Sequence, residues 1–289
     1  MRTKFTKKAI AGMLLVIVAT VVAIQWMHRR MLELRCAENL RQIGVALTQY
    51  SHESRGDFPL LAMTPGRITF EVAALYPKFL PDTSVFVCPA HPKRRALLQA
   101  ASEKPESAID DESYWYLGYL IMHERSGLAW VNEYEHFVPK LTAIPEANDV
   151  WPDCVENAKA RQEDWSRVIE KYRSRKGKYP FAYNSCASPQ IPERRFYMRL
   201  VAGIQRFMEY DVNNVNGAKE MAKVVPIMIE RPQLHGNGGH VLFMDGHVEF
   251  RTYPGKFPMT VDFIDELCSL DKLENKPCRC TFDANRLYR

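Results

Sequence analysis

The run of 19 residues from 9 to 27 constrains the fold most, because it carries no charge and only Thr20 and Gln25 are clearly polar, so burial in a bilayer is favoured over exposure to water. As a helix rising about 1.5 Å per residue, the run reaches ~28 Å, the thickness of one hydrocarbon core. Trp26 lies where an interfacial aromatic residue is expected. Basic residues flank the run: Arg2, Lys4, Lys7 and Lys8 before it, and His28, Arg29 and Arg30 after it. The sequence therefore predicts a single membrane-spanning helix preceded by a short tail, residues 1–8.

The orientation of this helix is set only weakly, since basic residues occur on both sides. A cytoplasmic N-terminus is favoured because the chain's seven cysteines would then lie in an oxidising space. We therefore expect a single-pass protein of the cell inner membrane, with residues 57–289 forming an extracytoplasmic head. A signal peptide cleaved after Val21-Val22-Ala23 is the alternative.

The residues after the membrane run predict that the same helix continues. Apolar residues recur at steps of three and four, which is typical of an amphipathic helix. They are Leu32, Cys36, Leu40, Ile43, Leu47 and Tyr50, with Arg35, Glu38 and Arg41 between them. No helix breaker separates this stripe from the membrane run, so residues 28–56 are expected to extend the helix until Gly56 and Phe58-Pro59 end it.

The second strong signal is a hairpin around Asp245-Gly246. The segments 240–244 and 247–251 are rich in β-branched and aromatic residues, and Asp-Gly between them is typical of a two-residue type I′ turn. That turn predicts the pairs Met244–His247, Phe243–Val248, Leu242–Glu249, Val241–Phe250 and His240–Arg251. The predicted buried face then carries Val241, Phe243, Val248 and Phe250.

The remaining pattern indicates an α+β fold. We expect strands at 85–88, 114–122 and 224–229, a short helix or turn at 70–80, and helices at 155–175 and 261–270. Residues 100–112 read as a surface loop, 138–152 as irregular, 177–192 as a loop, and 196–208 as either strand or helix. Strand 224–229 and the hairpin would form an antiparallel β-meander covered by the long helix. Residues from about 125 to 195 would be a helical and loop insertion.

Composition and motifs exclude several functions. The net charge of +5 is too small to indicate nucleic-acid binding. The sequence lacks the zinc-protease, serine-hydrolase and nucleotide-binding motifs, and neither His52-Glu53 nor His123-Glu124 is followed by the second histidine of a zinc protease. We therefore expect no enzymatic activity and no cofactor.

The histidines near the hairpin invite a metal or catalytic interpretation, which the predicted geometry disfavours. His240 and His247 would share a face about 13 Å apart, whereas zinc ligands lie ~2 Å from the ion. His235 would lie at the opposite end of the strand from Asp245. The favoured roles are structural. Asp245, Gly246 and His247 belong to the turn, and Gly236, Gly238 and Gly239 allow a close backbone path after His235. Catalysis, metal binding and partner recognition stay as alternatives.

Four segments, in order, resemble one family. Cys36-Ala-Glu-Asn-Leu-Arg-Gln-Ile-Gly44 through Tyr50 and Asp57-Phe-Pro59 resemble the start of the type IV pilin-like, or pseudopilin-like, proteins of the prepilin-type processing-associated H-x9-DG group. Phe86-Val-Cys88-Pro89 resembles the group's Cys-Pro segment, and Ser113 to Gly118 resembles its Ser-Tyr-x-Tyr strand. His235, nine residues and Asp245-Gly246 resemble the H-x9-DG motif.

The resemblance implies a pilin-like fold and a structural role. A membrane-anchored protein of this kind would associate, through its N-terminal helix, with pilin-like or secretion-apparatus proteins, or with its own copies, near a type II secretion or type IV pilus-like apparatus. One departure matters. Prepilins carry a Gly before the cut and a Glu five residues later, but Ile17 stands at that position after Gly12-Met13. A permanently anchored relative is therefore expected rather than a processed pilin subunit.

The resemblance also bears on the cysteines and on calcium. It implies a Cys36–Cys88 disulfide, with free buried thiols as the alternative. Cys278 and Cys280 could pair with Cys268, Cys186 or Cys154, or form a C-x-C metal site. Pilin-like heads sometimes hold calcium in loops, but Asp211 to Gly217 does not fit the EF-hand pattern, so an Asn-rich turn is favoured.

Two other functions compete with the structural role. A membrane-tethered module that binds extracellular polymer or glycan would use exposed aromatic residues of segment 114–151. A hydrolase would have its site near His235. A polar pocket would favour the hydrolase, an exposed aromatic groove the binding module, and a continuous helix on a sheet the structural protein.

Overall fold

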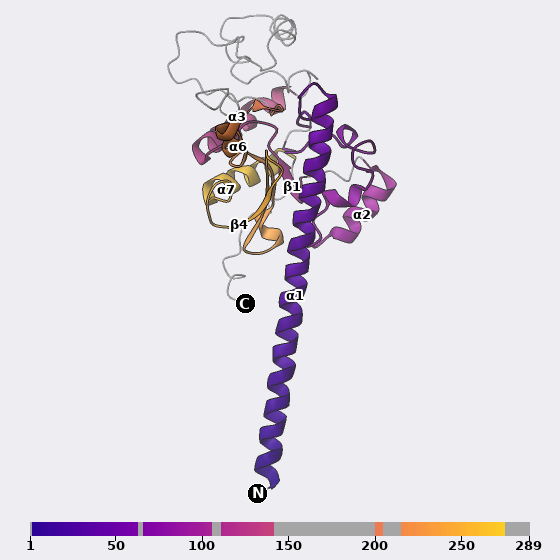
Figure 1. The fold of residues 1–289 in the computed structure, drawn as a ribbon, viewed down its shortest axis with the longest axis vertical. Coiled ribbons are helices and arrows are strands. Elements are labelled where there is room, and N and C mark those ends of the chain that lie inside the picture. Colours follow the sequence, from indigo (N-terminus) through magenta and orange to yellow (C-terminus); the bar gives the residue numbers. More distant parts are fainter. Residues whose placement is uncertain (1, 63–65, 106–110, 142–199, 205–214, 275–289) are drawn as a thin grey trace, which may run out of the picture.

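The computed structural model describes residues 2–62, 66–105, 111–141, 200–204 and 215–274. It consists of one long helix with a mixed α+β head around its C-terminal half (Figure 1). Helix α1 runs unbroken from Arg2–Glu53, and its N-terminal half extends away from the head. It is the one described helix that is long and apolar enough to cross a membrane. The predicted continuous rod is confirmed.

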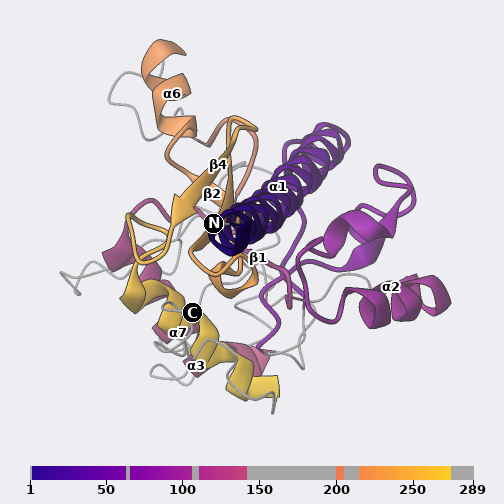
Figure 2. The ribbon, with the colours of Figure 1, turned by 90° about the horizontal axis from the view of Figure 1, so that it is seen from below.

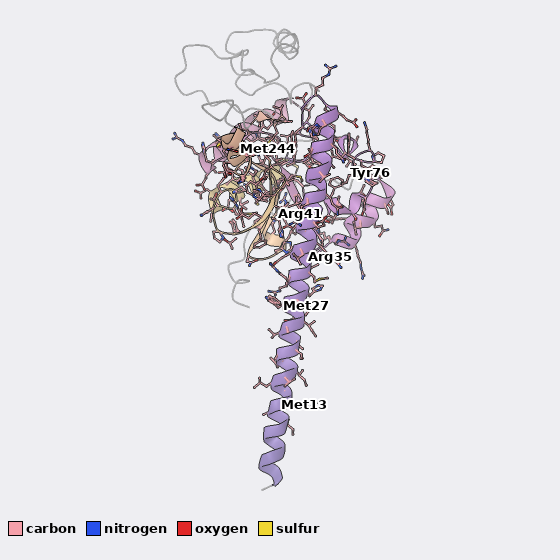
Figure 3. The ribbon with its side chains drawn as sticks, in the orientation of Figure 1. Met13, Met27, Arg35, Arg41, Tyr76 and Met244 are labelled. Atoms are coloured by element: carbon pink, nitrogen blue, oxygen red, sulfur yellow. The ribbon has the colours of Figure 1, made fainter. Side chains whose placement is uncertain are left out.

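The two halves of α1 have different surroundings. In the N-terminal half, apolar side chains such as Met13 and Met27 point outward with no neighbouring element beside them (Figure 3). In the C-terminal half, Leu40, Ile43 and Leu47 are fully buried against the head. The predicted stripe is therefore the face on which the head packs.

The predicted end of α1 is also found. Arg55 and Gly56 adopt positive φ angles of 58° and 96°, and the Gly56 N–H donates to the Ser51 carbonyl at 2.7 Å. A residue without a Cβ adopts this left-handed conformation at little cost, which explains why a glycine ends the helix.

The head contains an antiparallel four-stranded sheet in the order β1-β2-β3-β4. The strands are β1 (Tyr114–Tyr116), β2 (Pro226–Glu230), β3 (Gly238–Phe243) and β4 (Val248–Thr252). The predicted meander of β2, β3 and β4 is present. Strand β1 is shorter than the predicted 114–122, because the chain turns at Gly118, where φ is +67°.

The register of the hairpin differs by one residue from the prediction. His240 pairs with Phe250 and Leu242 with Val248, and the Phe243 N–H donates to the His247 carbonyl at 3.0 Å. The loop therefore has three residues, 244–246, with Gly246 at a φ of +88°. A turn followed by a left-handed glycine is the next commonest hairpin connection, and Asp-Gly suits it as well as type I′.

The shifted register changes which residues are buried. Strand β3 is buried on both faces: Leu242 faces α1, and Val241 and Phe243 face the opposite side. Val248 and Phe250, predicted to be buried, are only partly covered. In Figure 2, α1 lies between the sheet and α2, and α3 and α7 lie together on the other side of the sheet.

Short helices complete the head. They are η1 (Val72–Ala74), η2 (Thr83–Phe86), α2 (Arg94–Glu103), α3 (Glu124–Leu141), α6 (Val215–Ala222), η6 (Pro232–Leu234), α7 (Val261–Ser269) and η7 (Leu270–Glu274). Helix α7 and the helical turn at 70–80 were predicted. Residues 138–141, predicted to be irregular, belong to α3, and residues 200–204 form a turn with an isolated bridge at Val201 instead of a strand or helix. The other predictions for residues 142–208 fall outside the described residues.

Two local predictions were wrong. Segment 85–88 is not a strand, because the Asp82 side chain accepts a hydrogen bond from the Ser84 N–H at 2.8 Å and starts η2. Such local side-chain bonds compete with strand formation. The segment predicted as loop 100–112 begins inside α2, and its Asp111 is buried.

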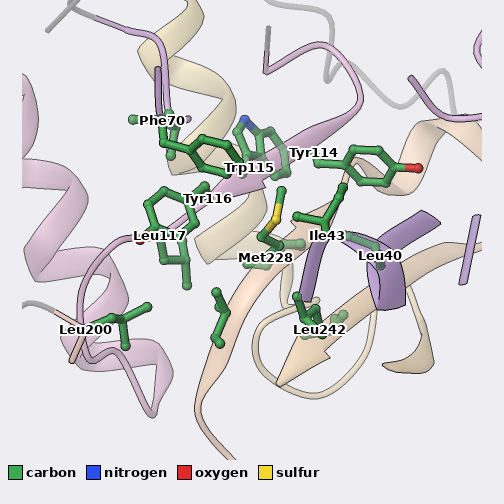
Figure 4. Close-up of a cluster of buried hydrophobic side chains, with 14 of the residues drawn as sticks. Leu40, Ile43, Phe70, Tyr114, Trp115, Tyr116, Leu117, Leu200, Met228 and Leu242 are labelled. Atoms are coloured by element: carbon green, nitrogen blue, oxygen red, sulfur yellow. The ribbon is translucent and has the colours of Figure 1, made fainter. Parts of the chain in front are cut away.

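The core lies where α1 meets the sheet. Figure 4 shows Leu40 and Ile43 of α1 beside Leu242 of β3 and Met228 of β2, with Tyr114 of β1 next to them. Helix and sheet approach closely at Gly44, where an added Cβ would lie 3.0 Å from Leu242 Cδ1. A larger residue at position 44 would therefore separate the helix from the sheet.

Substituting Gly44 tests this docking. Gly44→Leu is expected to lower the free energy of unfolding of the head by about 1–3 kcal/mol, the usual cost of overpacking. Gly44→Leu combined with Leu242→Ala should recover part of the loss. The adjacent Val45→Leu, at an exposed position, should change stability by no more than about 0.5 kcal/mol. Urea denaturation in detergent measures all three, and equal effects at positions 44 and 45 would contradict the proposed contact.

Candidate functional site

Four chemically reactive side chains converge where α1, β2 and two loops meet. They are Cys36 of α1, Cys88 after η2, Glu230 at the end of β2 and His235 after η6. One donor atom from each lies within 4.8 Å of the other three. Cys36, Cys88 and Glu230 are fully buried, and the His235 side chain is only 4% exposed.

The distances centre on the His235 ring. Its Nε2 lies 3.3 Å from Cys36 Sγ, 3.6 Å from Cys88 Sγ and 3.0 Å from Glu230 Oε1. The two sulfur atoms are 2.8 Å apart, and both cysteines are free thiols. The imidazole therefore contacts all three other groups.

Each cysteine is positioned by its local structure. Cys36 lies on the buried stripe of α1, one residue after the exposed Arg35, which lies at the lower edge of the head in Figure 3. The Cys88 N–H donates to Ser113 Oγ at 3.0 Å, which fixes the loop against the residue preceding β1. The Ala90 N–H donates to Cys88 Sγ at 3.3 Å, and the Tyr114 hydroxyl points at Cys36 Sγ at 3.8 Å.

The sheet positions the carboxylate. Glu230 Oε2 accepts from the backbone N–H of His240 at 3.0 Å and lies 2.6 Å from His240 Nδ1. These contacts leave Oε1 directed at His235. The carboxylate is thus held by β3 on one side and contacts the His235 imidazole on the other, with both sulfur atoms within 4.8 Å.

Burial and mutual contact shift the pKa values of these groups. Burial raises the pKa of the Cys88 thiol far above its ordinary value, and Cys36 and Glu230 raise it further. Burial alone would raise the pKa of Glu230, but hydrogen bonds from His235 and His240 hold it below its usual range. Burial alone would lower the pKa of His235, but its contacts with Cys36 and Glu230 raise it to about 10.

The residues of the H-x9-DG motif lie at two different places in the head. His235 lies in the cluster, whereas Asp245 and His247 pair with each other at the exposed turn. His240 and His247 were predicted to share a face, but they lie on opposite faces of the hairpin. The one-residue register shift places His247 beside Phe243, with ring centroids 4.4 Å apart.

The glycines between His235 and His240 lie where backbones approach closely. A Cβ on Gly238 would lie 2.1 Å from the Arg251 carbonyl oxygen, and one on Gly239 would lie 2.7 Å from that of Glu230. Side chains at these positions would push β3 away from β4 and from β2. The glycines therefore set the path that brings His235 and His240 to the two oxygens of Glu230.

Several other sequence predictions fall outside the described residues. These are the cysteines at 154, 186, 278 and 280 and the Asn-rich segment up to residue 214. Cys268 of α7 is buried and disulfide-bonded. Glu230 was not identified from the sequence, although its carboxylate connects both histidines of the cluster.

The arrangement supports two kinds of chemistry. The two sulfurs could be oxidised to a disulfide, or the four donors could bind a metal ion together. Comparison with protein-family models, with curated proteins and with solved structures gave no match. The function is therefore inferred from the residues and their geometry.

Proposed function

We propose that this protein is a single-pass membrane protein with a pilin-like extracytoplasmic head, which acts by association and carries out no chemical step. Its N-terminal helix would pack in the bilayer against pilin-like or secretion-apparatus proteins, or against its own copies. The observation that carries the proposal is one unbroken helix, Arg2–Glu53. Its residues 10–27 are exposed and largely apolar, and its second half packs against an antiparallel sheet.

The exposed half of α1 supports anchoring. Its large apolar side chains are exposed around the whole helix, and water disfavours such a surface unless lipid or protein covers it. The exposed residues are Ile10, Met13, Leu14, Leu15, Val16, Ile17, Val18, Val21, Val22, Ile24, Trp26, Met27, Met31 and Leu34. A bilayer would cover residues 9–27, and neighbouring helices within the bilayer would pack on the same surface.

The head supports association rather than the two rival functions. Described aromatic residues of segment 114–151, including Trp115, Tyr116 and Trp130, are buried and offer no exposed stacking groove. The cluster around His235 is buried among described residues, so a polymeric substrate would have no direct access to it. Within the described residues, neither a binding groove nor an open catalytic site is favoured.

Arginine substitutions in the middle of the apolar segment 9–27 test whether this segment anchors the protein in a membrane. Ile17→Arg with Val18→Arg is expected to cost about 5–7 kcal/mol of insertion free energy, since each arginine at a helix centre costs about 2.5–3.5 kcal/mol. The variant should leave the alkali-washed membrane fraction. Val45→Arg with Gln49→Arg, exposed positions on the same helix within the head, should remain in it. Equal retention of both variants would contradict a spanning helix.

Site-specific photocrosslinking in native membranes tests the association. A photoreactive residue at Val22, which is exposed in the apolar half, should capture a second hydrophobic N-terminal helix from this chain or from a pilin-like protein. The same probe at Val45, on the head, is the matched control and should not capture that helix. Capture at position 22 of abundant membrane proteins only, in proportion to their abundance, would overturn the proposal.

A further inference from the structure

We propose that Cys36, Cys88, His235 and Glu230 bind one divalent transition-metal ion, with zinc preferred, in a closed structural site that joins the membrane helix to the head. The inference does not depend on the proposed assembly function. It follows from the donor set, from the distances between donor atoms and from the groups that hold the donors.

The donor set suits zinc. Thiolate sulfur and imidazole nitrogen are the ligands that zinc prefers, and a carboxylate is its usual third type of ligand. Four protein ligands with no open position are typical of structural zinc sites. The four donors here come from α1, the loop after η2, the end of β2 and the residue after η6. Cys36, Cys88 and Glu230 are fully buried, and His235 is half-buried with its side chain 4% exposed.

The spacing between donors is close to that of a tetrahedral site. With Zn–S about 2.3 Å and Zn–N about 2.0 Å, tetrahedral geometry places sulfur and nitrogen ligands about 3.5 Å apart. His235 Nε2 lies 3.3 Å from one sulfur and 3.6 Å from the other. The sulfur–sulfur distance of 2.8 Å would open by about 1 Å, which rotation of the two cysteine side chains can supply.

The surrounding contacts favour a metal over a disulfide. Metal ligands are typically oriented by further hydrogen bonds, and Glu230 has such bonds from His240 to its Oε2 while Oε1 stays directed into the cluster. Donors also point at both sulfurs, from the Ala90 N–H and the Tyr114 hydroxyl, which suits thiolates. A disulfide would use only the sulfurs and would give a buried glutamate and histidine no role.

The charge of the site points the same way. Two thiolates and a carboxylate buried together repel one another, and a divalent cation removes most of that cost. With two thiolates, one carboxylate and a neutral imidazole as ligands, the ion reduces the net charge of the site from −3 to −1, and the protons that the ligands carried are released. The ion would connect Cys36 to Cys88, which follows it by 52 positions in the chain, and to His235, which follows it by 199 positions. Clips that close such long loops stabilise a fold strongly in principle.

Cobalt titration of the full-length protein tests the site. The protein is purified in detergent under reducing, oxygen-free conditions, stripped with a chelator and titrated with Co²⁺. We expect one ion per chain, thiolate-to-cobalt charge-transfer absorption and the intense visible bands of tetrahedral Co²⁺, with zinc displacing cobalt. Zinc should also protect Cys36 and Cys88 from alkylation, a measurement that needs no variant.

Variants locate the ion. Cys36→Ser, Cys88→Ser and His235→Gln should each weaken binding by more than about 100-fold, and His240→Gln, which removes an orienting contact, by about 10–100-fold. The matched control is Asp245→Asn with His247→Gln, which removes an exposed carboxylate–histidine pair and should leave binding unchanged.

Two results would overturn the proposal. One is a folded, reduced wild-type protein that binds neither cobalt nor zinc and whose Cys36 and Cys88 are alkylated equally with and without zinc. The other is protein from native membranes that carries a Cys36–Cys88 disulfide by mass spectrometry and no stoichiometric metal. Neither result bears on the crosslinking test of the assembly function, so the two proposals can fail separately.

Discussion

Replacing Arg231 with methionine is expected to lower the free energy of unfolding of the head by about 3–5 kcal/mol, the usual cost of removing one partner of a buried ion pair. The Arg231 guanidinium donates two parallel hydrogen bonds to Asp271, at 2.8 and 2.9 Å, and another to the Asp111 carbonyl. It also lies over the Trp115 ring, 4.4 Å from the centroid. The guanidinium also lies 3.4 Å from the Asp111 carboxylate. All of these groups are buried, so the substitution leaves the carboxylates of Asp111 and Asp271 without their cation.

Two further variants separate charge from geometry. Arg231→Lys keeps the positive charge but loses the planar fork, so its cost should fall between zero and that of the methionine variant. Arg41→Met is the matched control, because Arg41 makes an exposed pair with Glu38 and should contribute less than about 1 kcal/mol. Urea denaturation followed by tryptophan fluorescence measures these differences. A loss below about 1 kcal/mol for Arg231→Met would show that the buried pair contributes little.

The long helix could be predicted because its signal is local. Apolar residues at steps of three and four fix which side of a helix is buried, and Leu40, Ile43 and Leu47 are buried on that side. The end at Gly56 was predictable for the same reason, since a positive φ favours glycine at that residue. Neither inference needed knowledge of what packs against the helix.

The hairpin register could not be fixed from the sequence. Asp245-Gly246 suits both a two-residue and a three-residue loop, because each places Gly246 in the left-handed region. The choice depends on distant contacts: in the observed register Leu242 meets Gly44 of α1, whereas the predicted register placed Leu242 on the solvent face. A shift of one residue exchanges the faces of one strand relative to its partner.

The cluster was predicted only in parts. Resemblance to a family paired Cys36 with Cys88, and the H-x9-DG motif singled out His235, but no spacing in the sequence connects these residues. Glu230 was missed because the predicted strand ended at Ile229, one residue before it. A glutamate that ends an apolar strand directly before Arg231 was the available signal, since a buried acid needs partners.

Gly238→Ala is expected to destabilise the head by about 3–6 kcal/mol, because it combines two costs. Gly238 has a φ of +151°, where a side chain is strained by about 1–3 kcal/mol. The new Cβ would also lie 2.1 Å from the Arg251 carbonyl oxygen and 2.9 Å from Thr252 Cα, and backbone atoms cannot move aside as a side chain can. Relieving that contact means separating β3 from β4, which costs ladder hydrogen bonds.

Gly236→Ala separates the two costs. Gly236 lies two residues earlier with a φ of +81°, and an added Cβ there would meet no atom within 4 Å. Only the conformational cost remains, so the loss should be about 1–2 kcal/mol. Urea denaturation of both variants beside the wild type gives the difference. Similar losses would mean that β4 can adjust to a side chain at position 238, and the close approach of β3 to β4 would then not explain why a glycine occupies position 238.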